Sequence, residues 1–94
     1  IQYQAARGEP GRQQIISRSV SYHGTTVATT AVSGHAARKR GLAHVLQPHP
    51  TIATPYPLRC PLGRHHPDAT RFYLDNLRET IEAEGAHTIA ALLA

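Results

Sequence analysis

The segment from Thr88 to Ala94 limits the possible folds more than any other part of the chain. Every residue after Thr88 is apolar, and neither a charge nor a turn residue interrupts the run. Such a run is typical of a strand that is buried on both faces of a parallel sheet. A strand of this kind needs neighbours at its edges and helices over its faces, so the sequence predicts an α/β fold.

A second strong signal precedes this strand. Asp68 is a preferred N-cap residue and Gly85 a preferred residue at a helix end, so a helix is predicted from Asp68 to Glu84. Asp75 and Arg78 lie three residues apart on its solvated side, where they are expected to form a weak ion pair. The apolar residues of the helix fall at helical spacing and are expected to form one stripe: Tyr73, Leu74, Leu77 and Ile81.

The first half of the chain predicts a strand followed by a helix of small residues. Gln14 to Arg18 contains two adjacent isoleucines, whose β-branched side chains suit a sheet interior. Thr25 to Ser33 lies between Gly24 and Gly34, and glycines at both ends suit helix boundaries. Because its side chains are small, we expect this helix to pack its backbone closely against the sheet.

The remaining segments are shorter or less regular. Ile1 to Arg7 is predicted to be the end of a helix, and the chain turns at Gly8 to Gly11. Ala36 to Arg40 is predicted to be a second helical piece that ends at Gly41. Leu42 to Pro67 contains six prolines and is expected to be an irregular loop, because each proline removes an amide donor.

The predicted order is strand, helices, loop, helix, strand, which indicates a largely parallel sheet with flanking helices. Two strands do not make a stable sheet alone, so further strands are expected from sequence outside this chain or from a partner. With 94 residues, the chain has room for one domain and no separate second one. It starts with Ile1, has no methionine and stops within an apolar run, so we expect an internal fragment of a longer protein.

Composition restricts the location of the protein and its partners. Cys60 is the only cysteine, which excludes an internal disulfide and fits a reducing compartment. The sequence has no signal-peptide pattern and no apolar stretch near the roughly 20 residues of a membrane helix. We therefore expect a soluble, cytoplasmic protein without membrane partners.

The net charge of +4 is unevenly distributed, because the acidic residues are concentrated from Asp68 onward. We interpret this as a local imbalance that the rest of a longer protein cancels.

Seven histidines suggest a metal site, but their spacing does not support one. His65 and His66 are adjacent, and His44 and His49 lie in or near the proline-rich loop. Zinc sites need three or four convergent ligands, usually with cysteine or acidic partners. We therefore expect no metal and interpret these histidines as surface residues.

Two other kinds of chemistry are also disfavoured. Arg38-Lys39-Arg40 is short for a nucleic-acid patch and has no interleaved aromatic residues, so it is interpreted as a solvated helix end and no nucleic-acid partner is expected. The sequence contains neither the Gly-x-Ser-x-Gly elbow of a hydrolase nor a phosphate-binding glycine loop. No base can be assigned to Cys60, which is interpreted as a structural or incidental thiol.

Tyr22-His23-Gly24 is the best candidate for a binding site. The triplet follows a predicted strand and precedes the small-residue helix, and α/β proteins bind ligands in such loops at the carboxyl ends of parallel strands. Tyr22 offers a flat face and a hydroxyl, while Gly24 allows close approach of the backbone.

A longer series of motifs resembles the class-III aminotransferases. The series runs in order through a strand that ends in Ser17-Arg18, the Tyr22-His23-Gly24 triplet, and a small-residue helix that ends in Ser33-Gly34. The segment Pro55 to Arg59 resembles a proline- and aromatic-rich stretch in the next loop of that family. The final residues resemble the strand that leads into a Glu-Pro pair, so the resemblance covers Gln14 to Ala94.

The resemblance implies a cofactor and a reaction. The chain would be part of the large domain of a fold-type-I enzyme that uses pyridoxal 5'-phosphate (PLP). Tyr22 would stack on the pyridine ring, His23 would lie beside it, and Gly24 would allow close packing at the helix start. The family moves an amino group between an amine or amino acid and a keto acid, and works as a homodimer.

The resemblance also implies that catalytic groups lie outside this chain. The Schiff-base lysine and the aspartate that faces the pyridine nitrogen would follow Ala94, so no catalytic residue is predicted here and the fragment is expected to be inactive alone. Lys39 is the only lysine and is expected in an exposed turn. Two other hypotheses stay open: a noncatalytic remnant that pairs with a partner chain through the edge of Thr88 to Ala94, and a small basic nucleic-acid module.

Overall fold

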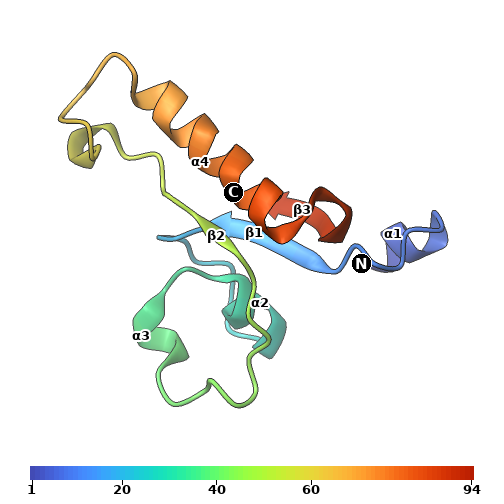
Figure 1. The fold of residues 1–94 in the computed structure, drawn as a ribbon. Coiled ribbons are helices and arrows are strands. Elements are labelled where there is room, and N and C mark those ends of the chain that lie inside the picture. The colour runs from blue at the N-terminus through green and yellow to red at the C-terminus, as the bar shows by residue number, and fades with distance from the viewer.

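The computed structural model describes residues 1–94 and contains a three-stranded, fully parallel sheet (Figure 1). The strands are β1 (Gln14–Arg18), β2 (Thr51–Ile52) and β3 (Ile89–Leu93), and their order across the sheet is β2-β1-β3. The α/β class that the sequence predicts is thereby confirmed. β1 lies in the centre, and its two adjacent isoleucines project from opposite faces of the sheet, both of which helices cover.

The chain also contains four α-helices and two short 3-10 helices. The α-helices are α1 (Gln2–Ala6), α2 (Val27–Val32), α3 (Ala36–Lys39) and α4 (Ala69–Glu84); the 3-10 helices are η1 (Pro57–Arg59) and η2 (Ala86–Thr88). None of the helices has the length and apolar character that crossing a membrane requires. The helices predicted for the beginning of the chain, for the small-residue segment and for the basic segment are all present.

The helices lie on both sides of the sheet (Figure 1). The chain passes from β1 to β2 through α2 and α3 below the sheet in this view, and returns from β2 to β3 through α4 above it. Crossovers between parallel strands are right-handed in nearly all proteins. The connection from β1 to β2 and the one from β2 to β3 run in opposite directions across the sheet, so they must lie on opposite faces. The strand order therefore accounts for the layered arrangement.

β2 corrects the expectation that the whole of Leu42 to Pro67 is irregular. Its two residues pair with the end of β1 in the register Ser17 with Thr51 and Arg18 with Ile52. The Ser17 amide donates to the Pro50 carbonyl at 3.1 Å. Two residues between prolines carry no recognisable pattern, so the strand is fixed by pairing with β1 and not by local sequence.

β3 forms where the sequence predicts it but is not buried on both faces. It pairs in parallel with β1 only, with a register irregularity between Gln14 and Ile15. It is an edge strand in this sheet, and Leu92 is 49% exposed. The parallel pairing is confirmed, whereas the expected burial is not present within these 94 residues.

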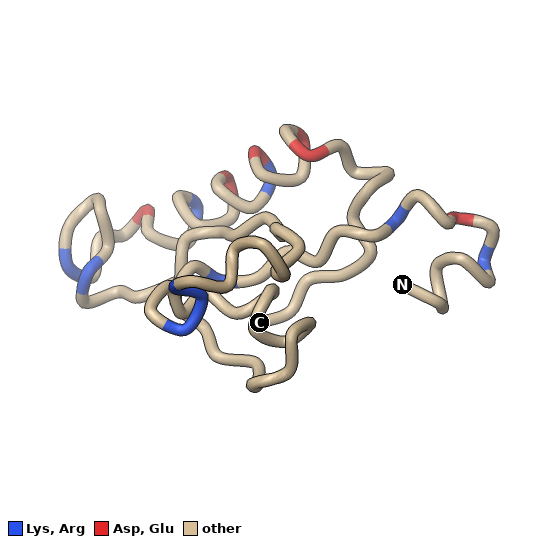
Figure 2. Tube along the Cα trace, turned by 90° about the horizontal axis from the view of Figure 1, so that it is seen from below, with Lys and Arg blue, Asp and Glu red and all other residues tan.

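α4 is the longest element and agrees only in part with its predicted pattern. Gly85 ends it with a φ of 83°, but the Asp68 side chain makes no capping hydrogen bond. The predicted pair forms, because Arg78 donates to Asp75 at 2.9 Å. Apart from Glu9, all acidic residues of the chain lie along or just before this helix (Figure 2).

The apolar stripe of α4 is divided between the interior and the solvent. Leu74 is 57% exposed and forms a shallow groove with Leu77 and Ile81. The helix is held to the sheet partly by polar contacts, since Asn76 Oδ1 accepts a hydrogen bond from the Ala53 amide at 2.7 Å. Leu74, Leu77 and Ile81 thus lie together as the predicted stripe requires, but Leu74 is not covered by another part of this chain.

The buried core is small and lies around β1. It comprises five apolar and two polar residues: Ile16, Ala31, Val32, Ile52, Cys60, Ser17 and Ser33. Ile15 lines an apolar groove with Val27 and Val32 of α2, so Ile16, the next residue along the strand, points to the opposite face. On α2, Ala31 and Val32 at the end of the helix are buried and complete this core.

Candidate functional site

The loop from Ser19 to Gly24 lies at the carboxyl edge of the sheet, directly after β1. Ligands of open α/β proteins bind at this edge. Thr54, which follows β2, joins the two loops there: its hydroxyl accepts a hydrogen bond from the Val20 amide at 2.8 Å and lies 3.3 Å from Ser19 Oγ. The loop that carries the Tyr22-His23-Gly24 triplet is thereby attached to the second strand as well as the first.

Hydrogen bonds from both sides hold the backbone around Tyr22. On one side, Ser21 Oγ donates to the Arg18 carbonyl at 2.8 Å, and the Ser21 carbonyl accepts from the Gly34 amide at 3.1 Å. On the other side, the His23 amide donates to Ser33 Oγ at 2.9 Å. Ser33 Oγ in turn donates to the carbonyl of Thr29, within α2, at 2.7 Å. The end of α2 therefore fixes the position of the loop.

Two glycines make this packing sterically feasible. A Cβ atom on Gly34 would overlap the backbone carbonyls of Arg18 and Ser19. Gly24 has a φ of +126°, and a Cβ atom there would lie 2.8 Å from Thr29 Oγ1. Gly24 thus packs against the first turn of α2, next to Thr26, whose side chain caps that helix by accepting from the Thr29 amide.

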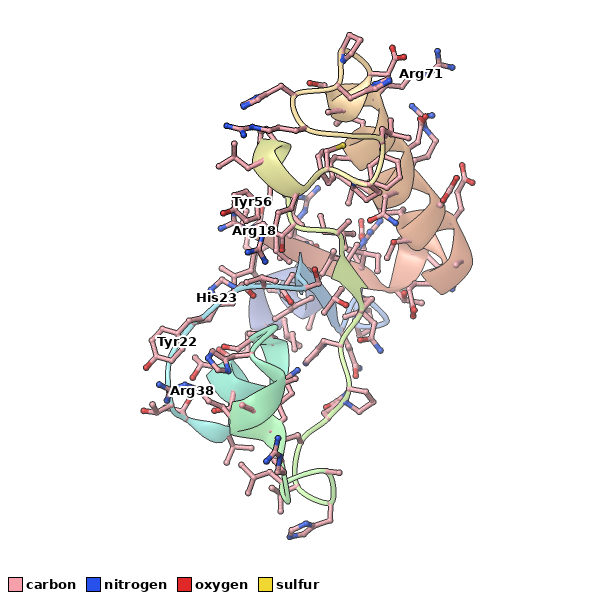
Figure 3. The ribbon with its side chains drawn as sticks, turned by 90° about the vertical axis from the view of Figure 1, so that its left-hand side faces the viewer. Arg18, Tyr22, His23, Arg38, Tyr56 and Arg71 are labelled. Atoms are coloured by element: carbon pink, nitrogen blue, oxygen red, sulfur yellow. The ribbon has the colours of Figure 1, made fainter.

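The Tyr22 ring projects outward from this fixed backbone. The side chain is 55% exposed and lines a groove of about 490 Å³ between Val20–Tyr22 and Gly34–Ala37. The guanidinium carbon of Arg38 lies 4.9 Å from the ring centroid (Figure 3). The ring is therefore held by a cation and still accessible to a ligand.

Three buried polar atoms near the end of β1 have no hydrogen-bond partner: Ser17 Oγ, Arg18 Nε and His23 Nε2. A buried polar atom without a partner costs about 1–3 kcal/mol, so native structures usually supply one. His23 lies between Tyr22 and Arg18 in Figure 3. The half-buried His23 ring thus offers a free ring nitrogen beside the exposed Tyr22 ring, an arrangement that fits a flat ligand with polar substituents.

The site includes residues that sequence reasoning missed. Arg38 lies exposed in the last turn of α3, as predicted, but its contact with the Tyr22 ring was not foreseen. Lys39 was expected in an exposed turn but is half-buried, and its Nζ donates to the Ala31 carbonyl at 2.8 Å. Ser33 had no predicted role beyond its place in a motif. These contacts join residues that are far apart in the sequence, and no local pattern signals them.

The histidines do not converge. No group of three or more His, Cys, Asp or Glu side chains lies close enough together to hold a metal ion. His49 packs near β1, where its Nδ1 accepts a hydrogen bond from the Ile15 amide at 3.3 Å. Burial, and secondarily the charge of Lys39, lower the pKa of His49 below its ordinary value of 6.5.

The chain is similar in sequence to known aminotransferases, although no family model matches it. It is 34% identical over 91 residues to a probable aminotransferase of Mycobacterium tuberculosis, covering 97% of this chain and 20% of that protein. It is 35% identical over 94 residues to the mitochondrial gamma-aminobutyrate transaminase 1 of Oryza sativa subsp. indica, covering 98% of this chain and 18% of that protein.

Solved structures agree with the sequence comparison. An amine transaminase from an uncultivated Pseudomonas species, in its PLP-bound form, superimposes with a TM-score of 0.86 at 35% identity over 97% of this chain and 21% of that chain. A thermostable omega transaminase from Pseudomonas jessenii matches with a TM-score of 0.84 at 31% identity over 95% of this chain and 20% of that chain. The chain thus spans about a fifth of the length of the proteins it matches. The resemblance to aminotransferases that the motif series indicates is therefore confirmed over nearly the whole chain, in sequence and in fold.

Proposed function

We propose that this chain is the cofactor-facing segment of the large domain of a class-III, PLP-dependent aminotransferase. The observation that carries the proposal is the presentation of Tyr22 and His23 at the carboxyl edge of a parallel sheet. The similarity to transaminases covers the same residues. A small core and many exposed apolar side chains support the view that further parts of the same enzyme surround the segment.

The residues at the site fit PLP. The exposed Tyr22 ring would stack on the pyridine ring, since aromatic faces favour offset stacking. The unpartnered Nε2 of His23 would meet a polar group at the edge of the cofactor. Gly24 would hold the start of α2 against the loop, because its positive φ and its contact with Thr29 leave no room for a side chain.

PLP, when bound, supplies the electron sink that lets an amino group move between an amine or amino acid and a keto acid. The residues of this chain would orient the ring and exclude water from one of its faces. We further propose that the complete enzyme is a homodimer. Its amino donor and keto-acid acceptor would bind partly through residues outside this segment.

Lys39 does not qualify as the residue that bonds to the cofactor, so the proposed segment would be inactive alone. It is the only lysine of the chain, and its Nζ donates to the Ala31 carbonyl near the end of α2. Its Nζ is thus engaged by α2, whereas the neighbouring Arg38 contacts the Tyr22 ring. A lysine elsewhere in the complete enzyme would carry that role.

The test is the substitution Tyr22→Ala in the complete aminotransferase. The affinity for PLP is measured by titrating the apoenzyme and following the absorption of the bound cofactor. Loss of the stacking face is expected to raise the dissociation constant about tenfold. Tyr3 in α1, before β1, is also exposed (67%, against 55% for Tyr22), so Tyr3→Ala is the matched control and should leave the affinity unchanged. An unchanged affinity for Tyr22→Ala would remove this role from Tyr22.

A noncatalytic partner-binding chain is the second candidate, because β3 has an unpaired outer edge. Leu92 and Leu93 are exposed on this strand, and open apolar edges favour pairing with another chain. This candidate predicts that the 94-residue chain associates with a partner or with itself. Sedimentation of a well-folded, stable monomer would argue against it.

A further inference from the structure

The Tyr22 ring has one charged neighbour, and that neighbour comes from a different element. The guanidinium of Arg38, in α3, lies 4.9 Å from the centroid of the ring, 16 residues further along the chain (Figure 3). This is the shortest of the three cation–aromatic contacts in the molecule, the others being 5.7 Å and 5.9 Å. A cation over an aromatic face within about 6 Å is attracted by the electrons of the ring.

The position of Arg38 is set by the backbone and not by its own flexible side chain alone. α3 begins two residues after Gly34, whose amide is bonded to Ser21, the residue next to Tyr22. At its other end, Lys39 ties α3 to α2 through the Ala31 carbonyl. The helix that carries Arg38 is therefore attached on both sides to the elements that hold the tyrosine.

No acidic residue competes for Arg38. Glu9 is the only acid before Asp68, and it pairs with Arg12. Arg38 takes part in none of the ion pairs of the structure. The aromatic face is thus the most favourable partner within reach, and a planar guanidinium covers such a face better than an ammonium does.

We propose that Arg38 is a positioning residue for Tyr22. It covers one face of the ring and restricts its rotation, which leaves the other face oriented for the cofactor. This inference rests on the proposed function, since it concerns the same ring. It assigns a role to a residue that no pattern in the sequence connects with the site.

The experiment compares Arg38→Met, Arg38→Lys and the control Arg40→Met in the complete aminotransferase. Arg40 is a neighbouring exposed arginine with no aromatic partner. Arg38→Met is expected to raise the PLP dissociation constant about two- to fivefold, the range that an exposed cation–aromatic contact supports. The dissociation constant of Arg38→Lys is expected to lie between those of the native enzyme and Arg38→Met. That of Arg40→Met should equal the native value.

A second measurement addresses the ring directly. NMR spectra of the apoenzyme with isotope-labelled tyrosine should show the Tyr22 ring signals moving in Arg38→Met but not in Arg40→Met. An unchanged dissociation constant in Arg38→Met would overturn the inference, and so would unchanged ring signals. Tighter cofactor binding in Arg38→Met would also overturn it, because the guanidinium would then compete for the face that the cofactor needs.

A double-mutant cycle separates this inference from the proposed function. If Arg38 acts through Tyr22, Arg38→Met should have no further effect in a Tyr22→Ala background. If Tyr22→Ala leaves cofactor affinity unchanged, the proposed function fails at this site, whatever Arg38 does. If Tyr22→Ala weakens binding but Arg38→Met does not, only the role of Arg38 is lost.

Discussion

The backbone amide of His23 donates a hydrogen bond to Ser33 Oγ at 2.9 Å, across ten residues of sequence. Ser33 is 1% exposed, and its hydroxyl also donates to the Thr29 carbonyl. One buried hydroxyl thus links the loop of the candidate site to the last turn of α2.

Ser33→Ala is expected to loosen the loop. The variant leaves the His23 amide without its acceptor, and the free energy of unfolding should fall by about 1–3 kcal/mol. Hydrogen exchange followed by mass spectrometry should show faster exchange in a peptide covering residues 19–24. Thr25→Ala, which removes an exposed hydroxyl next to the loop that makes no hydrogen bond, is the control. Equal exchange in native and Ser33→Ala proteins would mean that the bond does not hold the loop.

Gly34→Ala is expected to displace the loop by overpacking. The new methyl group would overlap the carbonyls of Arg18 and Ser19, which are backbone atoms and cannot rotate away. Destabilisation of about 1–3 kcal/mol is expected in urea unfolding. Gly11→Ala is a matched control, because no atom lies within 4 Å of a Cβ atom there. Similar unfolding midpoints for the two variants would contradict the close contact at Gly34.

Thr26→Ala should destabilise α2 by about 1 kcal/mol, the usual contribution of a threonine N-cap. Its Oγ1 accepts from the Thr29 amide at 3.2 Å. Thermal unfolding monitored by circular dichroism provides the measurement. Thr25→Ala removes a neighbouring exposed hydroxyl that makes no hydrogen bond and should have little effect. The prediction fails if the two variants unfold at the same temperature.

His49 should make stability depend on pH below about 6.5. Because burial and Lys39 lower its pKa in the folded state, the unfolded state binds the proton more readily. The free energy of unfolding should therefore be retained above the ordinary value of 6.5 and decrease as the pH falls from there toward the folded-state pKa. Protonation would also remove the acceptor of the Ile15 amide.

Urea unfolding at a series of pH values tests the role of His49. His49→Gln should flatten the dependence of stability on pH over this window, whereas His44→Gln, in an exposed turn, should retain it. Lys39→Met should weaken the dependence in part, because it removes the smaller of the two causes. If the free energy of unfolding of His49→Gln still varied with pH as in the native protein, another group would be responsible for the pH dependence.

Patterns within single elements were predictable from the sequence. The β-branched isoleucines predict the strand from Gln14 to Arg18, and flanking glycines predict the helix of small residues. Helical spacing of apolar residues predicts the helix that ends at Gly85. The motif series around Tyr22 indicated the family because several short matches occur in a fixed order. In both cases the information lies within short stretches of chain.

Features that depend on distant partners were not predictable in the same way. Thr51 and Ile52 become a strand only because the end of β1 offers unpaired backbone groups. Leu74 has the spacing of a core residue but remains 57% exposed within these 94 residues. The contact of Arg38 with Tyr22 depends on how α3 is tied to α2, which helical spacing in a four-residue element does not reveal.

The hydroxyl of Thr54 has a consequence for the thermodynamics of ligand binding. It bonds the loop after β1 to the segment after β2, so the loop of the candidate site loses its conformational freedom when the chain folds. A ligand that docks on Tyr22 then meets a preorganised surface and does not have to order it. Most of the conformational entropy of this loop is lost when the chain folds. Binding of the ligand should therefore cost little further entropy of the protein.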